Sequence, residues 1–197
     1  MNNQNSTPGV FFDRDGVIIP DEEFVLDPVN SIIYEDVPVS LNRLREAGFS
    51  LAIITNQTVV ARGLISEEKM LELNEIILKD IMDKGGPSFD GFFYCPHHPE
   101  STLLNYRVNC DCRKPKPGLI IKASQELNIN LQKSFMIGDR ISDIIAGFSA
   151  GCRTILLRTG KHKSPPIISD IPIDYSIKPD FQCDHLIEAV DWILEQT

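Results

Sequence analysis

The segment Val10-Phe11-Phe12-Asp13-Arg14-Asp15-Gly16 decides the fold class of this chain. Its three apolar residues form a short continuous run, which is typical of a strand buried on both faces, and the run ends directly in acidic residues. Four more short apolar runs follow: Leu51–Ile54, Gly91–Tyr94, Phe135–Ile137 and Thr154–Leu157. Because helical patterns separate these runs, we expect an α/β domain with a doubly wound parallel sheet.

Residues that typically begin or end helices indicate the helices between the expected strands. Ser66 is expected to cap a helix whose apolar residues Met70, Leu73, Ile77 and Ile81 recur every three or four positions. Four further helices are expected: Val39–Ala47, ended by Gly48; one with Pro117 in its first turn, running to Leu127; one capped by Ser142 and ending near Gly151; and one opened by Asp184.

Length and charge exclude several classes of protein. A chain of 197 residues fits one domain spanning 1–197, and 42% hydrophobic and 24% charged residues are ordinary globular values. A net charge of −9 argues against nucleic-acid binding, although local donors can still hold a small anion. We find neither an apolar run of about 18 residues nor an export signal, so we expect no membrane contact and a cytoplasmic location. We also expect a monomer.

Polar residues follow the expected strands where ligands bind in such sheets, beyond the carboxyl ends. They are Asp13 and Asp15, Thr55-Asn56-Gln57, Arg113-Lys114, Asp139 and Asp143. One carboxylate can attack a phosphate while a second protonates the leaving oxygen and activates water. Mg²⁺ would offset the crowded charge, and a lysine and a hydroxyl would hold the phosphoryl oxygens. Each group alone also fits a turn, a helix cap or a solvated pair, but the ordered set favours phosphoryl transfer.

These motifs resemble those of the haloacid dehalogenase superfamily of phosphatases. The stretch from Cys95-Pro96-His97-His98 to Cys110-Asp111-Cys112-Arg113-Lys114-Pro115, with the segment 56–63, resembles its heptose-bisphosphate and histidinol-phosphate phosphatase subfamily. The resemblance covers roughly residues 10–160. It implies a Rossmann-like core without a large cap domain.

The resemblance also implies roles for individual residues. Asp13 would be the nucleophile and Asp15 the general acid/base, with Thr55 and Lys114 stabilising the phosphoryl group. Mg²⁺ would be held by Asp13, Asp15 and Asp139, with Asp143 behind them. The expected substrate-binding residues are Asp21, Glu22, Phe24, Asn56, Gln57, Thr58, Arg113 and Arg140.

The close pairs Cys95-x-His97 and Cys110-x-Cys112, separated by residues 98–109, predict a zinc-binding loop over about 95–112. Three cysteines and a histidine form a closed structural Zn²⁺ site. Buried or surface thiols, or His98 in place of His97, are the alternatives, and the resemblance favours His97. Such a zinc would fold the loop that delivers Arg113 and Lys114 to the active site.

The long metal loop resembles the branch that removes the 7-phosphate of a heptose 1,7-bisphosphate, in carbohydrate metabolism. Lipopolysaccharide core and a nucleotide-activated heptose for a surface glycan are both compatible destinations of that sugar. The chain departs from the usual pattern at Val17, Ile19, Glu23-Phe24 and Val59. A histidinol-phosphate or other small sugar-phosphate phosphatase is therefore the alternative. A module that binds a phosphorylated ligand without turnover is a remote one.

Overall fold

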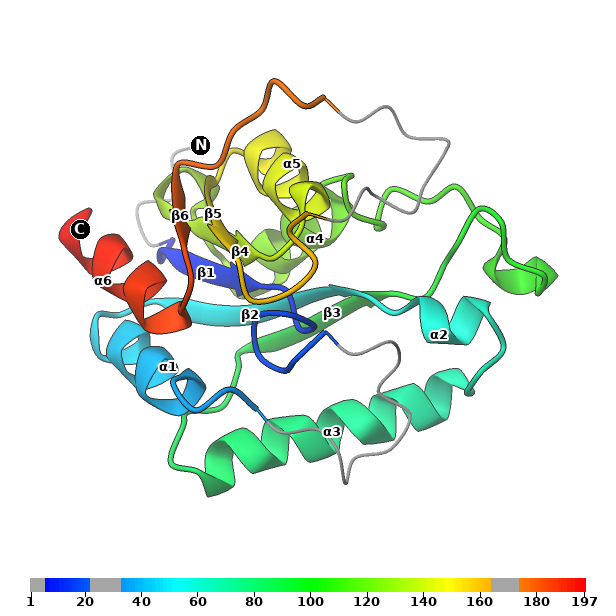
Figure 1. The fold of residues 1–197 in the computed structure, drawn as a ribbon, viewed down its shortest axis with the longest axis horizontal. Helices are drawn as coiled ribbons and strands as arrows, with labels where there is room; N and C mark the ends of the chain where they lie inside the picture. Colours follow the sequence, from blue (N-terminus) through cyan, green and yellow to red (C-terminus); the bar gives the residue numbers. More distant parts are fainter. Residues whose placement is uncertain (1–5, 22–32, 164–173) are drawn as a thin grey trace.

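The structure is a computed structural model that describes residues 6–21, 33–163 and 174–197. Six parallel strands form one sheet in the order β3-β2-β1-β4-β5-β6 (Figure 1). The strands are β1 (Gly9–Phe12), β2 (Ser50–Asn56), β3 (Gly91–Cys95), β4 (Phe135–Gly138), β5 (Arg153–Leu157) and β6 (Phe181–Cys183). The doubly wound parallel sheet expected from the sequence is confirmed, without a large cap domain in the described residues.

Helices cover both faces of the sheet. Two of them, α4 (Gly118–Leu127) and α5 (Ile141–Ala150), lie on one face, and α1 (Val37–Glu46), α3 (Glu67–Asp83) and α6 (Leu186–Glu195) lie on the other (Figure 1). A short helix, α2 (Thr58–Ala61), follows β2, and two 3₁₀ turns span Leu104–Tyr106 and Leu131–Lys133. Within the described ranges, every helix is too short or too polar to cross a lipid bilayer.

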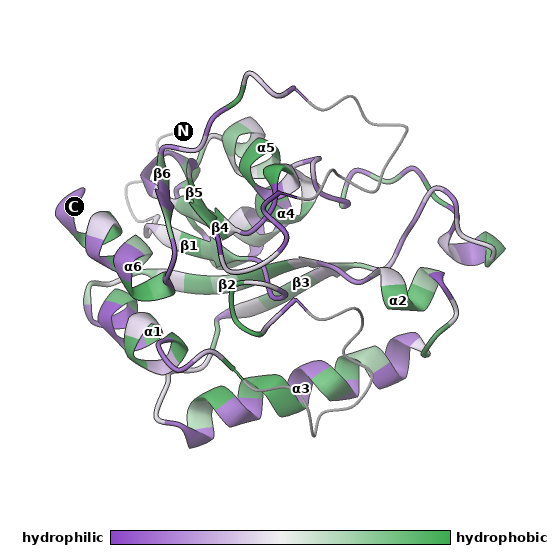
Figure 2. Ribbon diagram, in the orientation of Figure 1, coloured by the Kyte–Doolittle hydropathy of each residue, from purple (hydrophilic) through white to green (hydrophobic). Residues whose placement is uncertain are grey.

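The continuous apolar run of β1 divides between two cores because successive side chains of a strand point to opposite faces. Val10 and Phe12 pack into the core beneath α1, α3 and α6, whereas Phe11 packs into the core beneath α4 and α5. All three are 0% exposed. Figure 2 shows the same layering, with hydrophobic strands between helices that carry both hydrophobic and hydrophilic residues. Full burial of one such side chain contributes about 1.5–3 kcal/mol.

The structure corrects several expected boundaries. Helix α1 begins at Val37 and not at Val39, and α6 begins at Leu186 with His185, not Asp184, at its N-cap. Helix α5 begins at Ile141, and Ser142 does not cap it; instead the Asp143 carboxylate accepts a 2.9 Å hydrogen bond from the backbone N–H of Arg140. Strand β6 was not expected, because its three residues, Phe181-Gln182-Cys183, carry a polar residue at the centre. The cap at Ser66 is confirmed, since its hydroxyl accepts from the backbone N–H of Lys69.

The order of the strands places β1 between β2 and β4. The chain runs from β1 to β2 and β3 on one side of β1 and then crosses to β4 on the other side. The crevice for a ligand in such sheets lies at this switch point, beyond the carboxyl ends of the strands. Asp13 directly follows β1, Thr55 lies near the end of β2, and Asp139 directly follows β4. The fold therefore gathers the polar residues of three neighbouring strands at one edge.

Candidate active site

Three carboxylates meet at the carboxyl edge of the sheet. Oxygen atoms of Asp13, Asp139 and Asp143 all lie within 4.8 Å of one another. Asp13 and Asp139 come from the ends of neighbouring strands, and Asp143 comes from the first turn of α5. Asp139 and Asp143 are 0% exposed, so this charge is gathered inside the protein. Such a cluster needs positive charge nearby.

Lys114 provides part of that charge. Its Nζ lies 2.9 Å from Oδ1 of Asp13 and 2.7 Å from Oδ1 of Asp143, and it donates to the carbonyl of Ile54. The side chain of Asn56 holds this part of the chain, because its amide donates to the Lys114 carbonyl and its oxygen accepts from the Lys114 N–H. Asn56, expected to bind substrate, thus fixes the backbone that presents the lysine.

A divalent cation would neutralise the negative charge of the carboxylates that Lys114 does not balance. Within the described ranges, Oδ1 of Asp139 is buried without a hydrogen-bond partner, while Oδ2 accepts from the backbone N–H of Lys161 at 2.6 Å. Burial and the carboxylates of Asp143 and Asp13 raise the pKa of Asp139 to about 8. Burial also raises the pKa of Asp13 to about 7, although Lys114 acts in the opposite direction. Oxygen donors that lack a counter-charge are the ligands that Mg²⁺ prefers.

Gly16 makes room for Asp139. A Cβ at this position would lie 2.6 Å from the carboxyl carbon of Asp139, and the backbone has a φ of +82°, which glycine adopts at no steric cost. The sequence Asp-x-Asp-Gly therefore requires glycine for a structural reason. Any larger residue would push against an expected metal ligand.

The carboxylate of Asp15 lies outside the three-carboxylate group. Arg14 donates to both of its oxygens, with the Nη2 bonds measuring 2.8 and 3.0 Å. The amide of Gln57 also donates to Asp15 Oδ2, at 3.3 Å, and to the Thr55 hydroxyl at 2.9 Å. Gln57 thus joins the expected general acid to the hydroxyl expected to hold the phosphoryl group.

The other expected substrate-binding residues lie in different surroundings. The carboxylate of Asp21 pairs with Arg140 and with Lys161, at 2.8 and 2.9 Å. Thr58 begins α2 at the end of β2. Glu22 and Phe24, and with them the departure at Glu23-Phe24, lie outside the described residues. Val17 and Ile19 are 0% exposed, so these two departures fall in the core and do not face a ligand.

Arg113 is buried beside the metal loop, the segment 95–112. Its Nη1 donates to the carbonyl of His97 at 3.0 Å, while its buried Nε finds no partner among the residues that the structure describes. Burial lowers the pKa of this guanidinium, the nearby thiols raise it, and Arg62 lowers it further. A second guanidinium and an unused donor would favour an anion at this place.

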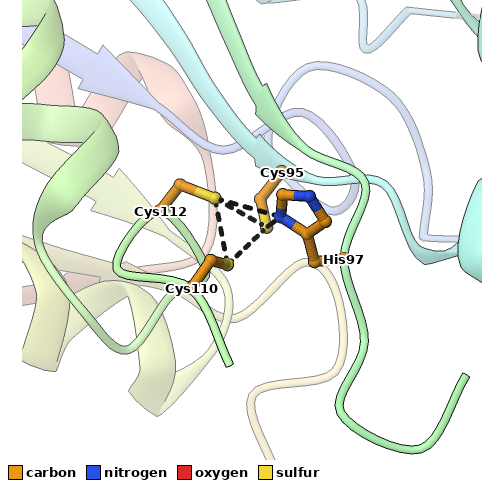
Figure 3. A group of neighbouring side chains, drawn as sticks. All are labelled: Cys95, His97, Cys110 and Cys112. Atoms are coloured by element: carbon orange, nitrogen blue, oxygen red, sulfur yellow. Dashed lines mark hydrogen bonds between the residues drawn. The ribbon is translucent and has the colours of Figure 1, made fainter. Parts of the chain in front are cut away.

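The metal loop brings its four expected ligands together. The Sγ atoms of Cys95, Cys110 and Cys112 and the Nδ1 of His97 all point toward one centre (Figure 3). The Sγ–Sγ distances are 3.5 Å for Cys95–Cys110, 3.1 Å for Cys95–Cys112 and 3.0 Å for Cys110–Cys112. Zn–S bonds of about 2.3 Å put tetrahedral sulfur ligands about 3.8 Å apart. The three sulfur atoms would therefore need to move apart by less than about 1 Å to bind a zinc ion. His98 is outside the group, and its Nδ1 accepts from the backbone N–H of Glu100.

The donor set suits a structural zinc. Four ligands close a tetrahedral site and leave no open position for chemistry. Its hydrogen bonds with Cys95 and Cys110 lower the pKa of the Cys112 thiol to about 5, although its burial opposes this. Cys112 is followed directly by Arg113 and Lys114, so the cluster fixes the start of the segment that supplies the active-site ammonium.

Comparison with known proteins identifies the class to which this fold and site belong: the chain is a member of the HAD-like hydrolases, the haloacid dehalogenase superfamily. A family model described as HAD-hydrolase-like matches residues 111–189. The chain is 40% identical to the D-glycero-beta-D-manno-heptose-1,7-bisphosphate 7-phosphatase of Yersinia pestis, over 79% of this chain and 83% of that protein. It is 37% identical to the protein of the same name from Escherichia coli K12, over 81% and 84%.

A solved structure extends the likeness to the whole fold. The D,D-heptose 1,7-bisphosphate phosphatase from B. bronchiseptica, crystallised with magnesium and phosphate, superposes with a TM-score of 0.78. It is 26% identical, and the match covers 96% of this chain and 99% of that one. The expected family is thereby confirmed.

Three residues of the site carried no role in the sequence interpretation: Arg14, which binds the Asp15 carboxylate, Lys161 and Asn74. Lys161 holds Asp139 through its backbone and Asp21 through its side chain. Asn74 accepts from Arg14, and it lies on the buried stripe of α3 between Met70 and Ile77. A polar residue on an otherwise apolar helix face was the available signal for Asn74. Lys161 had none, because its contact depends on the path of the loop after β5.

Proposed function

We propose that this protein is a Mg²⁺-dependent phosphatase that removes the 7-phosphate of a heptose 1,7-bisphosphate through a phosphorylated Asp13. The observation that carries the proposal is the position of Asp13, which directly follows β1 and lies beside Lys114, within the group that includes Asp139 and Asp143. The choice of a heptose 1,7-bisphosphate as substrate is based on the names of the chain's relatives. We further propose that the Cys₃His group holds zinc.

In the first step a carboxylate oxygen of Asp13 attacks phosphorus, and the bond from phosphorus to the sugar oxygen breaks. Asp15 gives its proton to that oxygen, so that the sugar leaves as an alcohol. In the second step water attacks the phosphorus of the acyl phosphate, Asp15 accepts the proton, and Asp13 is released with inorganic phosphate.

The other residues hold and neutralise the transferred group. Lys114 and the Thr55 hydroxyl lie at the same edge as Asp13 and would contact the phosphoryl oxygens. Asp13 and Asp139 would hold Mg²⁺, which supplies positive charge that offsets the dianion among carboxylates. Asp143 fixes Lys114 through their 2.7 Å ion pair.

Recognition of the second phosphate falls to Arg113. The Nε donor of the buried guanidinium is unused by any described residue, and the group lies close enough to Arg62 for the two charges to interact. An anion bound there would satisfy the donor and relieve the repulsion between the two cations. The 1-phosphate of the sugar is such an anion, and it remains on the product.

Phosphate release from a panel of sugar bisphosphates, sugar monophosphates and histidinol phosphate, with and without Mg²⁺, tests the proposal. The heptose 1,7-bisphosphate should give the highest kcat/KM, and phosphorus NMR of the product should show only the 1-phosphate. Faster turnover of histidinol phosphate would replace the proposed substrate. Release of the 1-phosphate would contradict the proposed regiochemistry.

A further inference from the structure

The side chain of Arg14 lies between the expected general acid and a helix far along the chain. Its Nε and Nη2 donate to the Asp15 carboxylate, with Nε 3.2 Å and Nη2 2.8 Å from Oδ1. Its remaining nitrogen, Nη1, donates to Oδ1 of Asn74 at 2.7 Å. The arginine side chain is 6% exposed, whereas that of Asp15 is 25% exposed. The guanidinium thus lies inside the protein and holds a carboxylate that is partly exposed.

Asn74 fixes the orientation of this guanidinium. The Asn74 amide nitrogen donates to the Met70 carbonyl at 2.8 Å, one turn earlier in α3. Because that bond uses the N–H side of the amide, the oxygen is left facing Arg14. Asn74 is 3% exposed, so water does not compete readily for its oxygen. The chain of contacts runs from the backbone of α3 through Asn74 and Arg14 to Asp15.

We propose that Arg14, anchored by Asn74, is a positioning residue that orients the Asp15 carboxylate for proton transfer. The inference rests on the proposed function, in which Asp15 protonates the leaving oxygen. A two-pronged contact restricts rotation of the carboxylate more than a single bond does. Without it, the hydrogen bonds among the described residues leave the Asp15 carboxylate only the 3.3 Å contact from Gln57. A displaced proton donor slows every reaction whose leaving group needs a proton.

A comparison of kcat/KM between substrates with different leaving groups tests this positioning role. An aliphatic alcohol leaves poorly without a proton, whereas 4-nitrophenolate leaves readily as an anion. The constant kcat/KM includes steps only up to formation of the phosphorylated enzyme, so later hydrolysis does not enter the comparison. We expect Arg14→Ala to lower kcat/KM about 100-fold for the sugar bisphosphate and less than about 3-fold for 4-nitrophenyl phosphate.

Further variants separate positioning from folding. Both substrates are measured on one preparation, so a partly unfolded sample lowers both values equally and leaves their ratio unchanged. Asn74→Ala should lower kcat/KM for the sugar bisphosphate about 10-fold more than kcat/KM for 4-nitrophenyl phosphate. Arg14→Lys should lose less kcat/KM for the sugar bisphosphate than Arg14→Ala does. In the Asp15→Asn background, Arg14→Ala should cause no further loss with the sugar bisphosphate. Arg45→Ala, which removes an ion pair with Asp90 next to the start of β3, should leave the ratio unchanged.

Equal losses of kcat/KM on the two substrates would overturn the inference and leave the proposed function intact. A further loss of more than about 5-fold from Arg14→Ala in the Asp15→Asn background would also overturn it, because Arg14 would then act by another route. A wild-type protein that releases phosphate from neither substrate would instead contradict the proposed function.

Discussion

The Nζ atom of Lys114 lies 2.9 Å from Oδ1 of Asp13, although the two residues are 101 positions apart in the chain. The contact depends on the segment after the metal loop, because Cys112 precedes Lys114 by two residues. It also depends on Asn56, which bonds both backbone groups of the lysine. The Lys114 ammonium thus links the thiol cluster, which lies just before it in the chain, to the Asp13 carboxylate that is proposed to attack phosphorus.

Replacing Lys114 tests that coupling. Lys114→Ala should lower kcat on the order of 10³-fold, since it removes the ammonium beside Asp13 and leaves Asp143 buried without its partner. Steady-state phosphate release measures the loss. Lys116→Ala is the matched control, because Lys116 lies two residues away and pairs with exposed Asp111. Comparable losses in both variants would show that the loop, not the ammonium at 114, matters.

The metal loop should hold about one zinc per chain. Cys110→Ser should lose that zinc and lower the melting temperature, because binding energy at a structural site is folding energy. Elemental analysis and thermal unfolding of protein purified without chelators provide the two measurements. Cys183→Ser replaces a buried cysteine outside the cluster and should keep its zinc. Wild-type protein without zinc would rule out this assignment.

Arg113 should select for a second anionic group. Arg113→Ala should reduce kcat/KM for the bisphosphate by about 10–150-fold, the equivalent of one charge-assisted contact, and affect a monophosphate much less. Competition between the two substrates measures the selectivity directly. Arg107→Ala removes another arginine of the metal loop, whose Nε donates to the Ser101 carbonyl, and should change neither value. Identical losses on the two substrates would exclude recognition by Arg113.

The stability of the Mg²⁺-free protein should fall as the pH rises from about 4 to about 8. In the folded protein the pKa of Asp13 is raised to about 7 and that of Asp139 to about 8, against an ordinary 3.8. The folded chain therefore keeps protons that the unfolded chain has released, and rising pH favours unfolding over this interval. Mg²⁺ competes with those protons, so its stabilising effect should grow over the same range.

Melting temperatures measured at several pH values, with and without Mg²⁺, test this dependence. Asp139→Asn should reduce the slope of stability against pH because it removes one of the two groups. Asp90→Asn, which changes a carboxylate beside Arg45 away from the site, should leave the slope unchanged. A Mg²⁺ effect of the same size at pH 5 and pH 8 would contradict the raised pKa values.

The sequence predicted the parts of the molecule whose signals are local. Five strands were recognisable because each is a short apolar run, and Asp13, Thr55 and Asp139 were recognisable because each lies at a strand end. Strand β6 lacked that pattern. The contact between Arg14 and Asn74 joins residues 60 positions apart, and no spacing rule specifies such a pair. Likewise, only the fold reveals that Val17 and Ile19 lie in the core.

The most direct test of the account is to trap the phosphorylated enzyme. Wild-type protein mixed with the heptose bisphosphate and Mg²⁺, and quenched in acid within milliseconds, should carry one phosphoryl group on the peptide that contains Asp13. Asp13→Asn should carry none. A phosphoryl group on any other residue, or none at any time during turnover, would contradict nucleophilic attack by Asp13.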